Sequence, residues 1–245
     1  MYTPTHPFFS ETQNIASVHH VFQEDAMDIL IFLLFLAGSY LLGSIPFGLL
    51  FVKWKTGLDL RKIQSGRTGG TNAGRAAGKL VGLSTAAVDF IKGAIPVWLA
   101  GFVLPGNVWL KILAPLAVII GHNYSIFLAE KDEKGKWVLR GGAGGAACVG
   151  GSLGLWAPSF LIILPLGALV FYLIGYASVA TMSVAVGSAI IFTVLTLFAD
   201  YPWEFILYGI LAEILLIWAL RPNIRALIEG NERPVGLRAR RNKAA

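Results

Sequence analysis

At 245 residues, with 56% hydrophobic and only 14% charged side chains, the chain is far more apolar than an ordinary soluble domain. Its mean hydropathy of +0.67 and several long apolar runs predict an all-α, polytopic membrane protein. The single cysteine, Cys148, excludes a disulfide framework and a cysteine-based metal site. The net charge of +6 does not indicate a nucleic-acid partner, because the positions of the charges follow membrane topology instead.

The polar N-terminal tail comprises residues 1–26 and contains no Lys or Arg, so it does not have the basic region of a signal peptide. We expect this tail to be weakly ordered and assign no chemistry to His19 and His20. A membrane domain at 27–221 and a basic, cytoplasmic C-terminal tail at 222–245 complete the predicted organisation.

Seven apolar segments are predicted to cross the bilayer: about 28–54, 80–104, 108–128, 141–155, 158–174, 179–198 and 203–220. The first contains Pro46, which should kink or break its helix unless neighbouring groups satisfy the freed carbonyl. The fourth consists almost wholly of small residues, which predicts a slim helix packed closely against its neighbours or a partly re-entrant one.

The basic residues predict which ends of the spans face the cytoplasm. Alternating spans place the segments 53–79, 129–140, 175–178 and 221–245 on one side, and these hold 18 of the 20 Lys and Arg residues. The other two are Lys92 and Lys111. Because cytoplasmic segments are enriched in Lys and Arg, the N-terminus is expected outside a plasma membrane and any active face inside.

The glycine-rich loop at 59–79 is the main candidate for a binding site. Its glycines permit close backbone approach to a ligand, and successive backbone N–H groups can form an anion-binding nest. Arginine adds fixed positive charge suited to bidentate phosphate contacts. The loop therefore predicts a phosphate site at the membrane surface; the alternative is a basic loop that only fixes topology. Its candidate residues are Ser65, Gly66, Arg67, Gly69, Thr71, Asn72 and Arg75.

Later spans contribute other polar candidates. Asp89 and Lys92 share a helix face and form a structural ion pair or take part in catalysis. His122 could be a general base, a phosphate donor or a structural residue. Ser178 and Thr181 could bind a ligand or a neighbouring helix. No zinc, P-loop or Ser-His-Asp signature is found, and no metal is expected.

Over about residues 42–233, the sequence resembles the bacterial acyl-phosphate:glycerol-3-phosphate acyltransferases, a family of seven-span membrane enzymes. The family patterns GSIPFG and DIR correspond to residues 43–48 and 59–61, and the pattern GSGNIGATNxxR, from its serine onward, corresponds to residues 65–75. The patterns D..KG..P and GHN correspond to 89–96 and 121–123. The patterns YxS and NIxR…GxE correspond to 176–178 and 223–232.

The resemblance implies transfer of a fatty acyl group from acyl phosphate to the sn-1 hydroxyl of glycerol 3-phosphate, giving lysophosphatidate. It implies neither a cofactor nor an acyl-enzyme, and it implies the lipid bilayer as surroundings. Catalytic roles fall on Ser65, Arg75, Ser178 and Asn223. Substrate-binding roles fall on Gly66, Gly69, Thr71, Asn72, His122, Gly141 and Gly142.

Departures from the family pattern include three polar or charged family residues. The lysine of its GGKG motif is Ala143, the histidine of its HRxNI motif is Leu220, and an asparagine of its first loop is Arg67. Cations at Arg67, Arg140 or Arg221 could restore the positive charge. The stretch 130–140 has the character of an insertion. The alternatives to an active acyltransferase are a non-catalytic relative that binds lipid or phosphate and a small-solute transporter.

Overall fold

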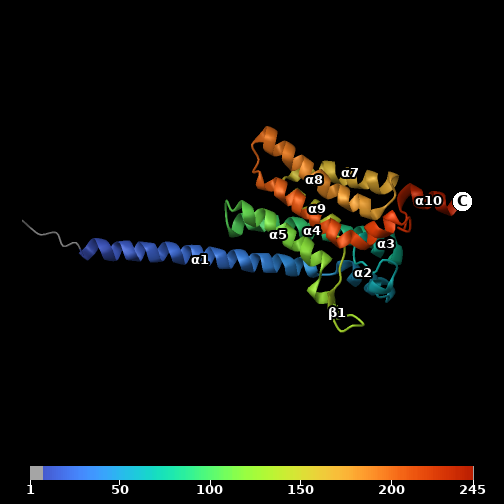
Figure 1. The fold of residues 1–245 in the computed structure, drawn as a ribbon, viewed down its shortest axis with the longest axis horizontal. Helices are drawn as coiled ribbons and strands as arrows, with labels where there is room; N and C mark the ends of the chain where they lie inside the picture. Colours follow the sequence, from blue (N-terminus) through green and yellow to red (C-terminus); the bar gives the residue numbers. More distant parts are fainter. Residues whose placement is uncertain (1–7, 245) are drawn as a thin grey trace, which may run out of the picture.

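The computed structural model describes the backbone of residues 8–244 and the side chains of residues 26–241. This part of the chain is largely helical (Figure 1). Its α-helices are α1 (Phe8–Ser44), α2 (Phe47–Thr56), α3 (Gly70–Ala77), α4 (Lys79–Val103), α5 (Val108–Asn123), α6 (Gly145–Leu155), α7 (Phe160–Leu173), α8 (Ala177–Ala199), α9 (Glu204–Ile228) and α10 (Gly236–Ala244). Short 3-10 turns are η1 (Leu60–Lys62), η2 (Ile126–Leu128) and η3 (Ala157–Ser159), and the two strands are β1 (Ala129–Lys131) and β2 (Trp137–Leu139).

The first helix is much longer than predicted. α1 has 37 residues, which at the α-helical rise corresponds to roughly 55 Å, and it projects beyond the other helices (Figure 1). Residues 8–25, predicted as part of a weakly ordered tail, are therefore helical backbone. Residues 1–7, and the side chains of His19 and His20, lie outside the described residues.

The predicted break at Pro46 separates α1 from α2. A proline removes one backbone donor and leaves nearby carbonyls without their helical partners. Here the ammonium of Lys92 donates to the carbonyl oxygen of Gly43 at 3.0 Å and lies 3.4 Å from that of Ile45, both next to the break. A buried lysine of α4 thus holds the broken helix in place.

The small-residue segment forms a tightly packed helix, as its composition predicts. A Cβ atom on Gly93 of α4 would clash with the backbone of Ala147, and one on Gly150 of α6 would clash with the backbone of Phe90. The two helices can therefore cross this closely only because both positions are glycine. On the other side of α6, the hydroxyl of Ser152 lies 2.8 Å from that of Ser188 on α8.

Five of the described helical segments are long and apolar enough to cross a membrane: Ala26–Thr56, Lys79–Val103, Val108–Leu128, Ala177–Ala199 and Glu204–Ile228. α6 and α7 are shorter apolar helices. Large apolar side chains such as Leu34, Phe102 and Phe198 are exposed on the surface, as expected where lipid is the solvent. The chain is an all-α integral membrane protein, and length alone identifies five of the seven predicted spans.

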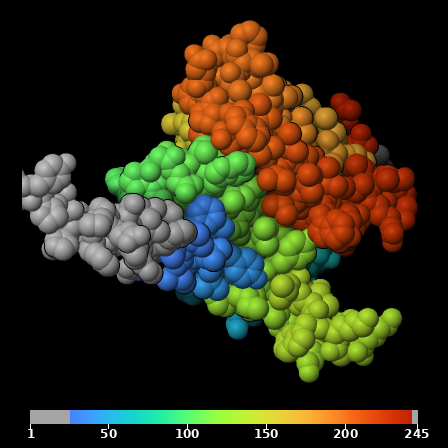
Figure 2. Space-filling model, turned by 60° about the vertical axis from the view of Figure 1, so that its left-hand side comes forward, coloured from blue at the N-terminus to red at the C-terminus, as the bar shows by residue number. Residues whose placement is uncertain are grey.

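The segment 130–140, predicted as an insertion, contains most of an antiparallel hairpin, in which Ala129 pairs with Leu139. It projects from the helical body (Figure 2). The α4–α5 and α8–α9 turns lie toward the end from which α1 extends, whereas α2, α3, β1 and α10 lie toward the opposite end (Figure 1). The segments that contain most basic residues therefore share one end of the molecule.

Candidate functional site

A cavity of about 660 Å³ lies at this end of the molecule. Its walls come from the glycine-rich loop with α3, the end of α5 with residues 139–146, the start of α8, and the end of α9 with the loop after it. All eleven predicted site residues line it: Ser65, Gly66, Gly69, Thr71, Asn72, Arg75, His122, Gly141, Gly142, Ser178 and Asn223. The fold thus brings four distant stretches of sequence together, while the individual roles stay predictions.

Asn72 holds the glycine-rich loop in shape. Its side chain is 3% exposed, and its Nδ2 donates to the carbonyl oxygens of Ile63 at 3.0 Å and Arg67 at 2.9 Å. Between them, Gly66 has a positive φ of 67°, which a residue with a Cβ adopts at a cost. The hydrogen bonds of the Asn72 amide and the turn at Gly66 therefore hold the loop in this conformation.

The first turn of α3 faces the cavity. Gly69 precedes it with extended backbone, and no side chain caps the helix. Its first N–H groups have no intrahelical acceptor, and helix N-termini of this kind favour anions. Thr71 and Arg75 lie four residues apart and share one face of the helix. The local structure therefore provides backbone donors, a hydroxyl and a guanidinium together.

Arg75 has little to neutralise it. Its Nη2 donates only to the backbone carbonyl of Arg233, at 3.4 Å, and within the described residues it forms no ion pair. Burial lowers the pKa of its guanidinium, the charge of Arg233 lowers it further, and that of Glu232 opposes the shift. An uncompensated cation in a cavity is suited to bind an anion.

Asp89, Lys92 and His122 form a buried cluster behind the cavity. Lys92 Nζ lies 2.8 Å from Asp89 Oδ1, so the predicted ion pair is formed. The same ammonium lies 3.0 Å from His122 Nδ1. Because an ammonium can only donate, His122 Nδ1 accepts and its Nε2 has the proton. A Cβ on Gly142 would clash with that Nε2, so Gly142 covers the imidazole in the cavity wall.

A second polar cluster joins α8 to α9. Ser178 Oγ donates to Glu232 Oε2 at 2.6 Å, and Asn223 Nδ2 lies 3.5 Å from Glu232 Oε1. The amide oxygen of Asn223 accepts from Arg67 Nε at 3.0 Å. Glu232 was not among the predicted site residues, although it lines the cavity, as does the loop candidate Arg67. The available signal for Glu232 was an acid in a largely basic segment, within the closing GxE pattern.

Among the described residues, no three His, Cys, Asp or Glu side chains come together as a metal site requires. Besides the carboxylates of Asp89 and Glu232, the groups that line the cavity include hydroxyls, backbone N–H groups and guanidiniums, which are suited to bind phosphate.

Comparison with known proteins agrees with this chemistry. A family model described as "Glycerol-3-phosphate acyltransferase" matches residues 33–230. The chain belongs to the glycerol-3-phosphate acyltransferase family. It is a membrane acyltransferase of phospholipid synthesis.

Relatives in this family match over most of their length. The chain is 34% identical over 216 residues to "Glycerol-3-phosphate acyltransferase 3" of Dehalococcoides mccartyi (strain CBDB1), covering 82% of this chain and 94% of that one. It is 36% identical over 201 residues to the "Glycerol-3-phosphate acyltransferase" of Rubrobacter xylanophilus, with 82% and 94% coverage.

Two solved structures are also similar. Both are crystal structures of PlsY (YgiH), an integral membrane glycerol 3-phosphate acyltransferase. The glycerol 3-phosphate form has a TM-score of 0.71 and 32% identity, covering 84% of this chain and 96% of that one. The lysophosphatidic acid form has a TM-score of 0.68 and 30% identity, with 84% and 95% coverage.

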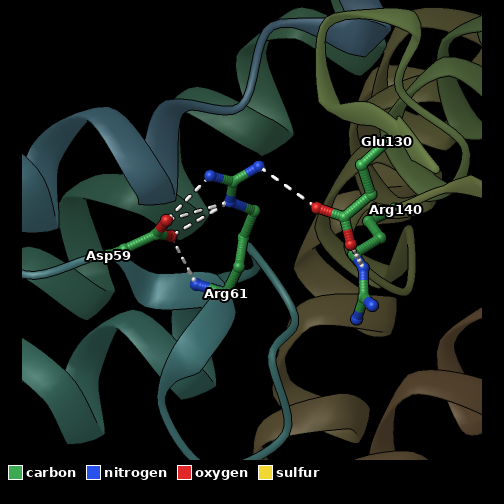
Figure 3. Close-up of polar contacts among 4 residues, drawn as sticks. All are labelled: Asp59, Arg61, Glu130 and Arg140. Carbon is green, nitrogen blue, oxygen red and sulfur yellow. Dashed lines mark hydrogen bonds and ion pairs between the residues drawn. The ribbon is translucent and has the colours of Figure 1, made fainter. Parts of the chain in front are cut away.

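This acyltransferase anchors its hairpin through charges near the cavity (Figure 3). Arg61 pairs with Asp59 at 2.7 Å and reaches Glu130 at 3.5 Å, and Glu130 also pairs with Arg140. The guanidinium of Arg61 lowers the pKa of Asp59 to about 2. Because Arg140 binds Glu130, its charge is already balanced at the edge of the cavity.

Arg221, another candidate for restoring charge, lies outside the cavity. Its guanidinium stacks 3.5 Å from the ring centre of exposed Trp218, and its Nε donates to the Trp218 carbonyl at 2.9 Å. This carbonyl is the one that Pro222 leaves without a helical donor. Arg221 therefore provides a donor for the carbonyl that Pro222 leaves free in α9. Of the three arginines, Arg67 alone lines the cavity with its charge unpaired among the described residues.

Proposed function

We propose that this acyltransferase uses acyl phosphate as its donor and acylates the sn-1 hydroxyl of glycerol 3-phosphate, releasing lysophosphatidate and inorganic phosphate. The observation that carries the proposal is the cavity itself. It combines a glycine-rich loop, an uncapped helix N-terminus and arginines without carboxylate partners among the described residues. The glycerol 3-phosphate and lysophosphatidic acid forms of the similar structures support the same substrate and product here.

In the reaction, the glycerol hydroxyl oxygen attacks the acyl carbon of the mixed anhydride. A new ester bond forms, the bond from the acyl carbon to the phosphate oxygen breaks, and inorganic phosphate leaves with the hydroxyl proton in the net balance. Acyl phosphate is already activated, so orientation of the two substrates and stabilisation of developing charge supply much of the rate enhancement.

Glycerol 3-phosphate is assigned to the first turn of α3. Ser65, Thr71 and Arg75 provide two hydroxyls and a guanidinium, and the backbone N–H groups after Gly69 provide further donors. Gly66 and Asn72 act by holding the loop.

Donors deeper in the cavity are assigned to the reacting centre. His122 directs its Nε2–H toward the wall formed by Gly142, where it can stabilise negative charge on an acyl or phosphate oxygen. Gly141 and Gly142 keep the backbone close to that point. Ser178 and Asn223, fixed by Glu232, complete the pocket.

The chain is proposed to cross a plasma membrane seven times, with the N-terminus outside and the cavity open to the cytoplasm. The five long spans, together with the shorter apolar helices α6 and α7, support this count. The shared position of the basic segments at one end supports the orientation.

The donor is tested by supplying purified protein with either palmitoyl phosphate or palmitoyl-CoA, each with glycerol 3-phosphate. We expect 1-palmitoyl lysophosphatidate and one equivalent of inorganic phosphate from palmitoyl phosphate, and no product from palmitoyl-CoA. Turnover with palmitoyl-CoA alone, or acylation of the sn-2 hydroxyl, would refute the proposal. Cysteine substitutions in 130–140 and 104–107, labelled from each side of the membrane, test the orientation.

A further inference from the structure

Arg67 extends from the glycine-rich loop across the cavity wall to other elements. Its Nε donates to Asn223 Oδ1 at 3.0 Å and its Nη1 to the carbonyl oxygen of Gly142 at 2.8 Å. Its Nη2 donates to the carbonyl oxygen of Ala219 in α9. All three acceptors are neutral, and Arg67 forms no ion pair in the part of the chain that the structure describes.

These contacts leave the guanidinium with both charge and donors to spare. Arginine has five N–H groups, and one on each of its three nitrogens is used, so one remains on each terminal nitrogen. Arg67 lines the cavity. Burial lowers its pKa, while the charge of Glu232 raises it. Arginine nevertheless stays protonated in proteins, so the cavity contains a cation that three neutral acceptors orient but do not neutralise.

The position of Arg67 is also informative. Its acceptors Gly142 and Ala219 directly precede Ala143 and Leu220, the two sites where the resembling motifs have lysine and histidine. Ala143 and Leu220 also line the cavity. One guanidinium from the opposite loop therefore lies beside both positions that have lost a cation.

We propose, on the basis of the proposed function, that Arg67 is a second phosphate-binding residue, which holds a terminal phosphate group separately from Arg75 and the start of α3. The two substrates each have one phosphate, so two cationic subsites match their combined charge. A second dianion at the Arg75 subsite would be repelled by the first, which favours a separate cation for it. The oriented guanidinium also offers the paired donors that suit phosphate oxygens.

The test compares Arg67→Gln, Arg67→Lys and the double variant Arg67→Gln/Ala143→Lys in steady-state acyl transfer, with KM measured for each substrate. Arg221→Gln is the matched control, because it removes an arginine charge outside the cavity. Arg67→Gln should raise KM for one phosphate substrate about 10- to 100-fold, the effect of losing charged hydrogen bonds. Arg67→Lys keeps the positive charge but not the three hydrogen bonds of the guanidinium, and it should retain much of that affinity. Ala143→Lys should recover part of the loss.

Inhibition by inorganic phosphate identifies which substrate's phosphate binds Arg67. If it is the phosphate of the acyl donor, Arg67→Gln should weaken inhibition by inorganic phosphate and raise KM for palmitoyl phosphate. If KM for glycerol 3-phosphate rises and inhibition by inorganic phosphate is unchanged, Arg67 shares the subsite assigned to Arg75, and the proposal of a separate subsite is refuted. The first pattern supports the second subsite and assigns it to the acyl donor.

Three further results would overturn the inference. One is an unchanged KM for both substrates in Arg67→Gln. Another is equal impairment of the Lys and Gln variants without rescue by Ala143→Lys, which indicates that Arg67 acts only as a scaffold. The third is an effect of Arg221→Gln equal to that of Arg67→Gln. The same assay records turnover by the unmodified protein. If the unmodified protein shows no turnover, the proposed function itself is refuted, and this is distinguishable from failure of the Arg67 inference. Thermal unfolding in detergent confirms that each variant is folded.

Discussion

Replacing Lys92 by methionine is expected to destabilise the protein strongly, because this lysine is 2% exposed and joins four groups. Its ammonium pairs with Asp89 at 2.8 Å, contacts His122 at 3.0 Å, and donates to the carbonyl oxygen of Gly43 at 3.0 Å. It also lies 3.4 Å from the carbonyl oxygen of Ile45. Methionine fills a similar volume, so the change removes the charge and the donors with little loss of packing.

The expected loss of unfolding free energy follows from the buried groups that Lys92→Met leaves without a partner. Removing one partner of a buried ion pair costs about 3–5 kcal/mol, and a buried carbonyl without a donor costs about 1–3 kcal/mol. We therefore expect Lys92→Met to lose at least about 4 kcal/mol of unfolding free energy. In Asp89→Asn/Lys92→Met no uncompensated charge remains, so the loss should shrink to about 1–3 kcal/mol.

The assay is unfolding in mixed detergent micelles, followed by circular dichroism, with Lys111→Met as the control for losing a lysine from a predicted span. The control should change the unfolding free energy by less than about 1 kcal/mol. The folded double variant should also transfer acyl groups more slowly, because His122 loses the donor that fixes its tautomer. A Lys92→Met variant as stable as the wild type would refute this reasoning, as would a double variant no more stable than Lys92→Met.

Two further predictions concern the cavity wall and the surface pair. Gly142→Ala should abolish acyl transfer, because the added methyl group would clash with the His122 ring. Gly38→Ala is the control, because a Cβ atom there has no neighbour within 4 Å, and it should leave turnover unchanged. Equal activity of the two variants would disprove the close contact between Gly142 and His122. The folded-state pKa of Asp59, about 2 beside Arg61, lies below its unfolded value of about 4, so its stabilising contribution is present above pH ~4 and disappears as the pH falls toward 2. Comparison of acid unfolding in the wild type and Asp59→Asn checks this: the wild type should lose on the order of 1 kcal/mol more, and identical acid profiles would contradict it.

The sequence patterns were sufficient to predict residues that line one cavity, because these residues lie in short motifs that keep their spacing. Glycines, a helix N-terminus and two arginines all fall within the loop 65–75. Pro46 and the small residues of α6 act locally, so their effects on helix continuity and packing were also predictable.

Other features depend on contacts between residues far apart in the chain. Arg67 meets Asn223 across 156 positions, and no spacing argument connects them. The length of α1 was missed because polarity was interpreted as disorder, although residues 8–25 contain no proline or glycine to end a helix. The hairpin was missed because its strands have three residues each, with a turn set by the side chain of Asp132 and the positive φ of Gly135.

The most direct test of the account is acyl transfer from palmitoyl phosphate to radiolabelled glycerol 3-phosphate by the purified protein, compared with Arg75→Ala and Arg221→Ala. Arg75 donates to one backbone carbonyl only, so its loss should leave the fold intact. We expect activity in the wild type and in Arg221→Ala, and a fall in kcat/KM of about 10- to 100-fold or more in Arg75→Ala from the lost charged contacts. Unchanged turnover in Arg75→Ala, or an inactive wild type that is folded, would contradict the claim that this cavity binds phosphate for catalysis.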